Sequence, residues 1–416
     1  MIAAVIFVGV YFTSVLSLAP VLPRRVSRSQ YRLYSTGSLN DPSSELTNTL
    51  ARLDQQWKIQ QKLQPRSRWT TLVLPKDDED KKSFEEPSFA TVTSGQDYCY
   101  LLEPPNNTVP SCLIVFTGGA GLGTYPQIAY NEFLLRLSNR LNAAVITAPY
   151  QVGLDHFALA KSTGDITRRA ILHCQDDPSR QYSANIPIFS LSHSLGSKLA
   201  CIYVTATEQN YDGIGYISFN NFSFGATIGM AKEFAEVIRN SAGYDNRVSG
   251  ISSDAINTLF NFAEMAISAV GIDFSPSQND MDRLMKLKYG DAQRCKTRFF
   301  SFDDDILENT QDAVAACGDI PTVSGLPGTH LTPVYFKLGI EDLELPDDAK
   351  EMARDAMGGF RNISFGNNEE LELLVSEVCN WILSQGPSRQ PIWRKEQPLL
   401  VGQTTGTSTS TDNAET

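Results

Sequence analysis

The segment Ser192-His193-Ser194-Leu195-Gly196 follows an apolar run, 186–191, and precedes a helix-like stretch, 198–209. A serine between a strand and a helix, with a small residue two positions away on each side, is typical of a tight turn that presents its hydroxyl. Larger flanking side chains would collide in such a turn, and the helix N-terminus behind it favours developing negative charge. The segment therefore predicts a nucleophile at Ser194, with Ser192 standing where glycine is usual.

Strand-like and helix-like segments alternate on both sides of this turn. The expected strands are 112–116, 143–148, 186–191, 214–219, 297–302 and 320–324, after β-rich pieces at 69–74, 88–93 and 97–102. The expected helices are 127–141, 155–172, 198–209, 345–357 and 368–384. This alternation indicates a parallel sheet with crossover helices. Together with the serine turn it predicts an α/β-hydrolase fold, which is a mostly parallel sheet flanked by helices.

Composition divides the chain of 416 residues into four parts. We expect a targeting segment at 1–40, a helical or linker extension at 41–67, the α/β-hydrolase domain at 68–385 and a disordered tail at 386–416. Within the domain, 224–292 is almost entirely helix-like. That stretch interrupts the alternation and predicts a helical lid.

A serine hydroxyl becomes a good nucleophile when a base takes its proton and an acid orients the base. In α/β-hydrolases the acid and then the histidine follow the serine along the chain. Of the four histidines, His156 and His173 precede the serine and His193 lies inside the turn. His330, in the Gly- and Pro-containing loop 326–333, is therefore the predicted base.

The orienting acid is expected directly after the strand 297–302, where Asp303, Asp304 and Asp305 stand in a row. An acid followed by one residue and then two apolar residues fits Asp304 best, so Asp304 is the predicted acid. The choice among the three aspartates stays open, and a solvated turn is the alternative for three adjacent like charges.

The loop after the strand 112–116 is rich in glycine and predicts part of an oxyanion hole. In this class of fold, that loop supplies one backbone N–H to the substrate oxygen and the residue after the nucleophile supplies another. The expected donors are Gly119 and Ala120 from the loop, and Leu195 from the turn.

Neither a cofactor nor a metal is expected. The glycine loop has G-x-G-x-G spacing instead of G-x-G-x-x-G, and no acid that could hold a ribose lies between Glu132 and Asp155. No H-E-x-x-H motif and no cysteine pair with ligand spacing occurs. The net charge of −12 argues against nucleic acid and anionic membranes as partners. The seven scattered cysteines indicate free thiols in a reducing compartment.

The composition of the N-terminal segment predicts a targeting signal. Residues 1–19 are uncharged and mostly apolar, as in a signal peptide, and 20–40 contain arginines and serines but no acid, as in a transit peptide. This order predicts bipartite import into a complex plastid, with no stable membrane span in the mature protein. Secretion and a membrane anchor formed by the apolar stretch are the alternatives.

With these residues in place, the chain resembles the α/β-hydrolase-like family called domain of unknown function 1350, found in cyanobacteria and plastid-bearing eukaryotes. The resemblance covers roughly 68–385, and Ser192 and the two terminal extensions depart from it. The matching segments are 116–120, Gly123, 126–127, Tyr130, 148–150, 155–156, 192–196, 218–222, 274–277 and 328–333. The resemblance implies the fold and a triad, but no particular reaction.

We therefore expect a serine hydrolase that cleaves an ester, thioester or amide through Ser194, His330 and Asp304. Apolar positions within 256–270 would form an apolar lid and suit a small-molecule acyl or lipid substrate; the more usual interpretation of such a stripe is simple packing. Acyl transfer to an acceptor other than water would use the same residues. The alternative from another class is a catalytically inactive binding or scaffold protein in the plastid, because this fold hosts such proteins.

Overall fold

A computed structural model describes most of the predicted domain. The described residues are 51–58 without 52 and 56, 68–74, 97–227 without 181, 208 and 210, 273–339 and 362–385. Several predictions fall outside these ranges: the targeting segment 1–40, the strand 88–93, most of the lid, the helix 345–357 and the tail 386–416.

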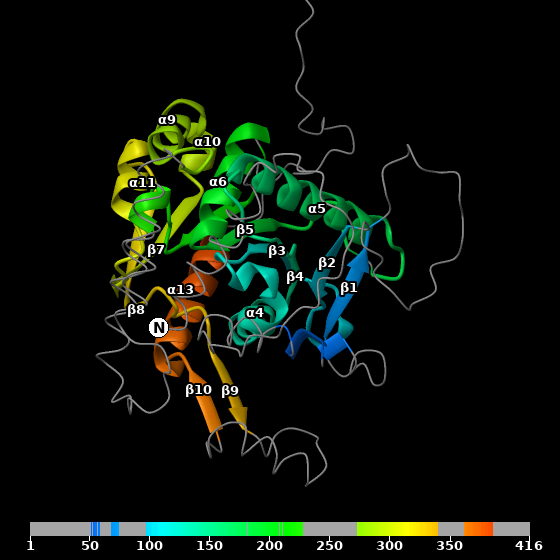
Figure 1. Cartoon of the computed structure of the whole chain (residues 1–416). Coiled ribbons are helices and arrows are strands. Elements are labelled where there is room, and N and C mark those ends of the chain that lie inside the picture. The colour runs from blue at the N-terminus through cyan, green and yellow to red at the C-terminus, as the bar shows by residue number, and fades with distance from the viewer. Residues whose placement is uncertain are drawn as a thin grey trace, which may run out of the picture.

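Eight strands form one twisted sheet in the order β1-β2-β4-β3-β5-β6-β7-β8 (Figure 1). The strands are β1 (Trp69–Val73), β2 (Tyr98–Leu102), β3 (Cys112–Thr117), β4 (Ala143–Thr147), β5 (Ile188–His193), β6 (Gly213–Ile217), β7 (Thr297–Asp304) and β8 (Thr322–Thr329). Strands β3 to β8 pair in parallel, whereas β1 and β2 are antiparallel to their neighbours. The protein has an α/β-hydrolase fold, as the alternation predicts.

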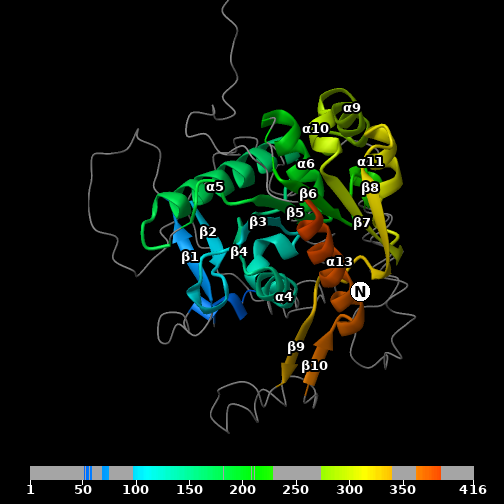
Figure 2. The same cartoon turned by 180° about the vertical axis from the view of Figure 1, so that it is seen from behind.

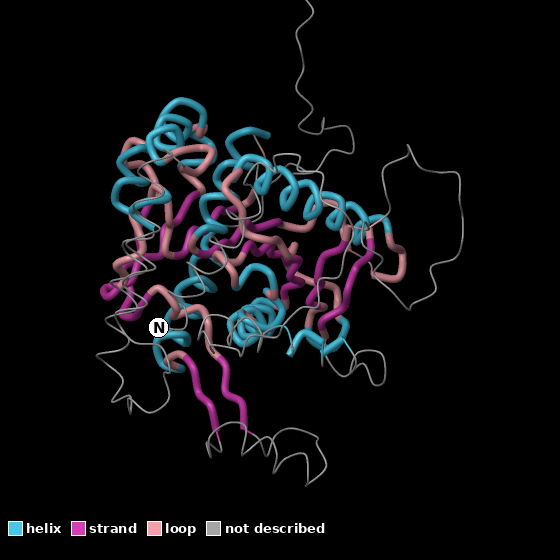
Figure 3. The backbone as a smooth tube through the Cα atoms, viewed as in Figure 1, coloured by secondary structure: helices cyan, strands magenta, loops and turns pink. Residues whose placement is uncertain are grey.

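Helices cover both faces of this sheet, as the two opposite views and the tube drawing show (Figure 1, Figure 2, Figure 3). The helices are α3 (Pro126–Ala129), α4 (Asn131–Leu141), α5 (His156–Asp176), α6 (Leu195–Thr207), α9 (Gln278–Lys288), α10 (Asp291–Arg294), α11 (Thr310–Ala316) and α13 (Asn368–Gln385). Short 3-10 turns lie at η2 (Pro105–Asn107) and η3 (Leu122–Thr124), and β9 (Phe336–Gly339) pairs with β10 (Asn362–Phe365) in a separate antiparallel ribbon.

The core is two apolar layers, one on each face of the sheet. Side chains alternate between the layers along β3, so Val115 joins the layer under α5 and α6 while Phe116 joins the layer under α4 and α13. Because both faces are covered, β3 is an uninterrupted apolar run. On the second face, Trp381 of α13 lies against β6, where a Cβ on Gly213 would come within 2.9 Å of its ring.

Three local departures from the expected elements matter for the site. The helix predicted at 127–141 is two helices, α3 and α4, which meet at Tyr130, where φ is −110° and ψ is 14°. Helix α9, at the end of the range expected for a lid, buries Met281 and Met285 completely in the layer beside α6. Helix α11, between β7 and β8, was not among the expected elements.

Part of the N-terminal extension packs on the domain. Asp54 is buried and accepts a hydrogen bond of 2.8 Å from Gln127 Nε2 in α3. Trp57 meets the ring of Tyr100 edge-on, with 5.5 Å between the ring centroids. This contact places the described residues of 51–58 beside β2 and α3.

The close packing of α5 on α6 can be tested by a substitution at Gly164. A Cβ on Gly164 would lie 2.2 Å from a ring carbon of Tyr203. Alanine is favoured over glycine inside a helix by about 1 kcal/mol, but a rigid ring cannot move aside easily. Gly164→Ala is therefore expected to lower the free energy of unfolding by about 1–3 kcal/mol in urea denaturation followed by circular dichroism.

The matched control is Gly153→Ala, because no atom lies within 4 Å of a Cβ at that position. It should unfold within about 0.5 kcal/mol of the wild type. A Gly164→Ala protein as stable as the wild type would contradict the packing of α5 on α6.

Candidate active site

Ser194 occupies a sharp turn between β5 and α6. Its φ of 56° lies in the left-handed region, which is uncommon for a residue other than glycine. The strand ends at His193 and the helix begins at Leu195. Hydrogen bonds of 2.9 Å from Ser194 N to Ile217 O and from Ser197 N to Ser194 O hold the turn. Backbone strain of this kind persists where the surrounding structure enforces it, often at functional sites.

The residues on either side of the turn explain why the motif needs small side chains. A Cβ on Gly196 would lie 2.3 Å from the carbonyl oxygen of Thr117 and 2.4 Å from that of Gly118, so only glycine fits there. Ser192 is fully buried, and its Oγ lies 3.3 Å from Ser197 Oγ. A serine is thus accommodated at the first position of the motif because its hydroxyl has a polar partner.

The structure brings Ser194 and His330 together with a third residue, Asp305. Ser194 Oγ lies 2.8 Å from His330 Nε2, and His330 Nδ1 lies 2.9 Å from Asp305 Oδ2 and 3.0 Å from Oδ1. The three side chains come from the turn after β5, the loop after β7 and the end of β8. These places lie at the carboxyl edge of the parallel strands, where α/β folds bind ligands.

The prediction that Asp304 orients the histidine is wrong. Asp304 is the last residue of β7, pairs with Thr329 of β8 and is exposed to solvent. A hydrogen bond from Asp305 N to Phe302 O closes a turn whose two central residues are Asp303 and Asp304. This turn places the Asp305 side chain, with no exposed surface, against His330. A register shift between β7 and β8 at this point decides which of the three aspartates faces inward.

The surroundings of Asp305 keep it ionised. Burial alone would raise the pKa of its carboxyl, because charge is costly away from water. His330, followed by smaller hydrogen-bond contributions that include the N–H of Leu307, outweighs burial and holds this pKa below its usual value. Burial raises the pKa of the neighbouring Glu308 to about 7, and the charge of Asp305 adds to the rise.

The ionised acid determines the proton positions on His330. A carboxylate can only accept hydrogen bonds, so His330 Nδ1 carries the proton that Asp305 binds. In the neutral ring, Nε2 is then an acceptor, and the Ser194 hydroxyl donates a hydrogen bond to it with 2.8 Å between Oγ and Nε2. This is the geometry in which a histidine can act as the base for a serine.

The residues predicted for the oxyanion hole divide into two groups. The N–H of Gly119 donates to the Tyr130 hydroxyl at 2.8 Å and is therefore not available to a substrate, which corrects the prediction for this residue. Within the described ranges, the N–H groups of Ala120 and Leu195 have no hydrogen-bond acceptor. Leu195 is the first residue of α6, whose first N–H groups have no partner inside the helix. We refer to residues 118–120 as the oxyanion loop.

His156 packs in the interior of the domain. Its ring stacks on Phe274 with 4.4 Å between the centroids, and the side chain is 1% exposed. Lys198 of α6 also lies over this phenyl ring, with its Nζ 5.4 Å from the ring centroid, and the same Nζ donates to Pro276 O at 3.1 Å. Burial lowers the pKa of Lys198 to about 8. This contact fastens the segment at the end of the predicted lid range to the helix that begins at the serine turn.

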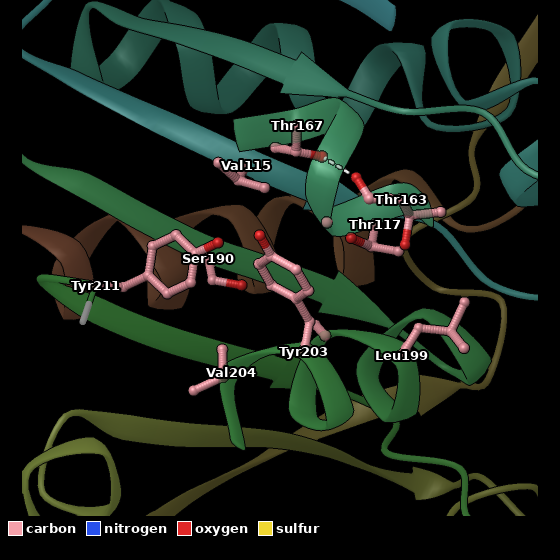
Figure 4. Close-up of a pocket in the computed structure, with 11 residues that line it drawn as sticks. Val115, Thr117, Thr163, Thr167, Ser190, Leu199, Tyr203, Val204 and Tyr211 are labelled. Carbon is pink, nitrogen blue, oxygen red and sulfur yellow. Dashed lines mark hydrogen bonds between the residues drawn. The ribbon is translucent and has the colours of Figure 1, made fainter. Parts of the chain in front are cut away.

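A small cavity lies on the face of the sheet covered by α5 and α6 (Figure 4). Its free volume of about 20 Å³ has room for a water molecule but not for an acyl substrate. Val115, Ser190 and Tyr203 are among its lining residues, whereas Ser194, Asp305 and His330 are not. The cavity is therefore separate from the candidate active site.

In the described part of the chain, no three or more His, Cys, Asp or Glu side chains gather in a way that could hold a metal ion. No helix in the same part has both the length and the apolar character needed to cross a membrane.

Comparison with known proteins identifies the family. A family profile with the description "Protein of unknown function (DUF1350)" matches residues 99–382. The chain belongs to this family. The matched range contains Ser194, Asp305 and His330, and also the oxyanion loop. No curated protein matches the chain in sequence.

Solved structures with a similar fold include several esterases. A fungal esterase structure from Rhizomucor miehei shares 11% identity with a TM-score of 0.40, covering 82% of this chain and 97% of that chain. Est1E from Butyrivibrio proteoclasticus shares 14% identity with a TM-score of 0.35, covering 70% and 94%. An esterase from Pyrococcus furiosus shares 8% identity with a TM-score of 0.39, covering 70% and 86%. At identities this low, the substrates of these esterases cannot be assigned to this chain.

The assignment of Asp305 as the acid can be tested by comparing substitutions of Asp305 and of its neighbour Asp304. Asp305→Asn removes the charge that orients His330 and should lower the rate at which a fluorophosphonate labels Ser194 by about 10³–10⁴-fold. Asp304→Asn removes the same charge one residue earlier, on an exposed side chain, and should change the rate less than about twofold. The measurement is the labelling time course of the full-length chain. A larger loss in Asp304→Asn than in Asp305→Asn would contradict the assignment.

Proposed function

We propose that the protein is a serine hydrolase that cleaves an ester, thioester or amide bond in a small acyl substrate. The buried, hydrogen-bonded series from Ser194 Oγ through the two ring nitrogens of His330 to Asp305 supports this proposal most directly. A serine at a strained turn, a histidine with an accepting nitrogen and an ionised acid are the three groups that acyl transfer through a serine needs.

The first half of the reaction forms an acyl-enzyme. Ser194 Oγ attacks the carbonyl carbon of the substrate while His330 Nε2 takes the hydroxyl proton. The negative charge on the carbonyl oxygen is bound by the N–H groups of Ala120 and Leu195, and the N-terminus of α6 adds a favourable field. The carbon–leaving group bond then breaks, and the leaving group receives the proton from His330. Asp305 stabilises the imidazolium throughout.

The second half releases the acid. A water molecule gives a proton to His330 Nε2 and attacks the acyl carbon of the ester on Ser194. The same N–H groups bind the oxyanion, and collapse of the intermediate returns the proton from His330 to Ser194 Oγ. Replacing the water by an alcohol, amine or thiol would make the protein an acyltransferase with no change in these residues.

Two finer features of the proposal rest on the sequence. The apolar positions within 256–270 favour an apolar acyl group, as in a lipid or fatty acyl ester. The signal-like stretch 1–19 followed by the arginine-containing stretch 20–40 favours a site of action in a plastid.

Labelling of the purified full-length chain with a fluorophosphonate tests the reaction class. We expect the wild type to become covalently labelled, Ser194→Ala to show no labelling, and His330→Ala to react at least about 10³-fold more slowly because the hydroxyl has no base. Ser190→Ala is the matched control: it removes a buried serine hydroxyl on β5 outside the site and should label like the wild type.

A folded wild-type chain that neither labels nor hydrolyses p-nitrophenyl acetate would contradict the proposal. That result would favour the alternative, a binding or scaffold protein on the same fold. Labelling that persists in Ser194→Ala would show that another residue is the nucleophile.

A further inference from the structure

A series of buried hydrogen bonds joins the oxyanion loop to the backbone carbonyl of His330. The N–H of Gly119 donates to Tyr130 Oη at 2.8 Å, and Tyr130 Oη lies 2.9 Å from His193 Nδ1. On the other side of the same imidazole, His193 Nε2 lies 2.8 Å from the carbonyl oxygen of His330. Tyr130 is 0% exposed and His193 is 1% exposed, so water does not compete for these bonds.

The N–H of Gly119 and the carbonyl of His330, at the two ends of this series, determine where each proton lies. The N–H of Gly119 can only donate, so the Tyr130 hydroxyl accepts there and directs its own proton to His193 Nδ1. His193 Nδ1 is therefore the unprotonated nitrogen, and Nε2–H donates to the His330 carbonyl. A neutral ring is required, and it is favoured because burial, with the nearby His330 adding to the effect, lowers the pKa of His193 to about 3.

The series is also packed tightly against the nucleophile. A Cβ on Gly119 would lie 3.0 Å from Ser194 Cβ and 3.1 Å from His193 Nδ1, so a larger residue would press on both side chains. The rings of His193 and His330 have centroids 5.0 Å apart. Tyr130 reaches this point because α3 and α4 meet at that residue, and the break directs its ring inward.

We propose that Tyr130 and His193 are positioning residues that hold the oxyanion loop and the His330 backbone in one fixed relation around Ser194. This inference rests on the proposed function. Through it, the N–H of Ala120 and the ring of His330 stay aligned with the same substrate carbonyl. Displacement of either group by about 1 Å is enough to cost on the order of 100-fold in rate.

Three variants separate the contribution of the bonds at Tyr130 from that of the bond between His193 and the His330 carbonyl. Tyr130→Phe leaves both Gly119 N–H and His193 Nδ1 without a partner. His193→Gln can keep a donor near the position of Nε2 and so the bond to His330 O, whereas His193→Asn can keep only the acceptor near the position of Nδ1. Tyr289→Phe is the matched control, because it removes a buried hydroxyl bonded to Thr297 Oγ1 at 2.6 Å, outside the site.

The expected effect is on the chemical step. Tyr130→Phe and His193→Asn should lower kcat for p-nitrophenyl acetate by about 10- to 100-fold with less than a threefold change in KM. His193→Gln should retain more activity than His193→Asn, and Tyr289→Phe should match the wild type. Wild-type kcat in both Tyr130→Phe and His193→Asn would overturn the proposal.

Nitrogen NMR of the full-length chain with ¹⁵N-labelled histidine gives a readout that does not depend on turnover. The chain has four histidines, so each ring can be assigned by substitution. We expect His193 to be neutral with its proton on Nε2 from pH 5 to 9, and the ring signals of His330 to shift in Tyr130→Phe but not in Tyr289→Phe. A proton on His193 Nδ1, or titration of His193 within that range, would overturn the proposal.

The same spectra separate this proposal from the proposed function. The hydrolase proposal fails if the folded wild type neither reacts with fluorophosphonate nor hydrolyses p-nitrophenyl acetate. The positioning link is then supported if Tyr130→Phe shifts the His330 ring signals, and it is overturned if those signals do not move.

Discussion

The left-handed backbone of Ser194 is the constraint on which the rest of the site depends. A non-glycine residue with a φ of 56° costs on the order of 1–3 kcal/mol, and the turn survives because β5 and α6 are anchored in the core on either side. This one conformation directs the buried hydroxyl to His330 Nε2 and leaves the N–H of Leu195 without an acceptor at the start of α6. It also forces Gly196 to be glycine.

Parallel strands then bring the remaining groups to the serine. The turn after β5, the loop after β7 and the end of β8 are far apart in sequence, but their strands belong to one sheet and meet at one edge. The hydrogen bonds run in one direction there, from Ser194 to His330 and from His330 to Asp305. Tyr130 and His193 connect the oxyanion loop with the backbone of His330. In the proposed reaction, one set of buried hydrogen bonds would thus hold both groups that act on the substrate carbonyl.

Sequence reasoning predicts the sheet from the alternation, Ser194 from the turn pattern and His330 from chain order. The structure has that sheet and brings the two side chains within hydrogen-bond distance. It missed Asp305 because three adjacent aspartates are equivalent in sequence, and only the turn over residues 302–305 selects one of them. It assigned Gly119 to the oxyanion hole because nothing in a glycine loop reveals that one N–H is bound to a tyrosine. The role of Tyr130 was concealed by a helical pattern that continues across the break between α3 and α4.

The central claim is that Ser194 is an activated nucleophile that passes through an acyl-enzyme. The most direct measurement is mass spectrometry of the full-length chain quenched in acid during turnover of p-nitrophenyl acetate, with the adduct located by peptide mapping. We expect a single acetyl group on Ser194 that forms and then disappears as the ester is consumed. A folded chain that carries no adduct, or an adduct on a residue other than Ser194, would contradict it.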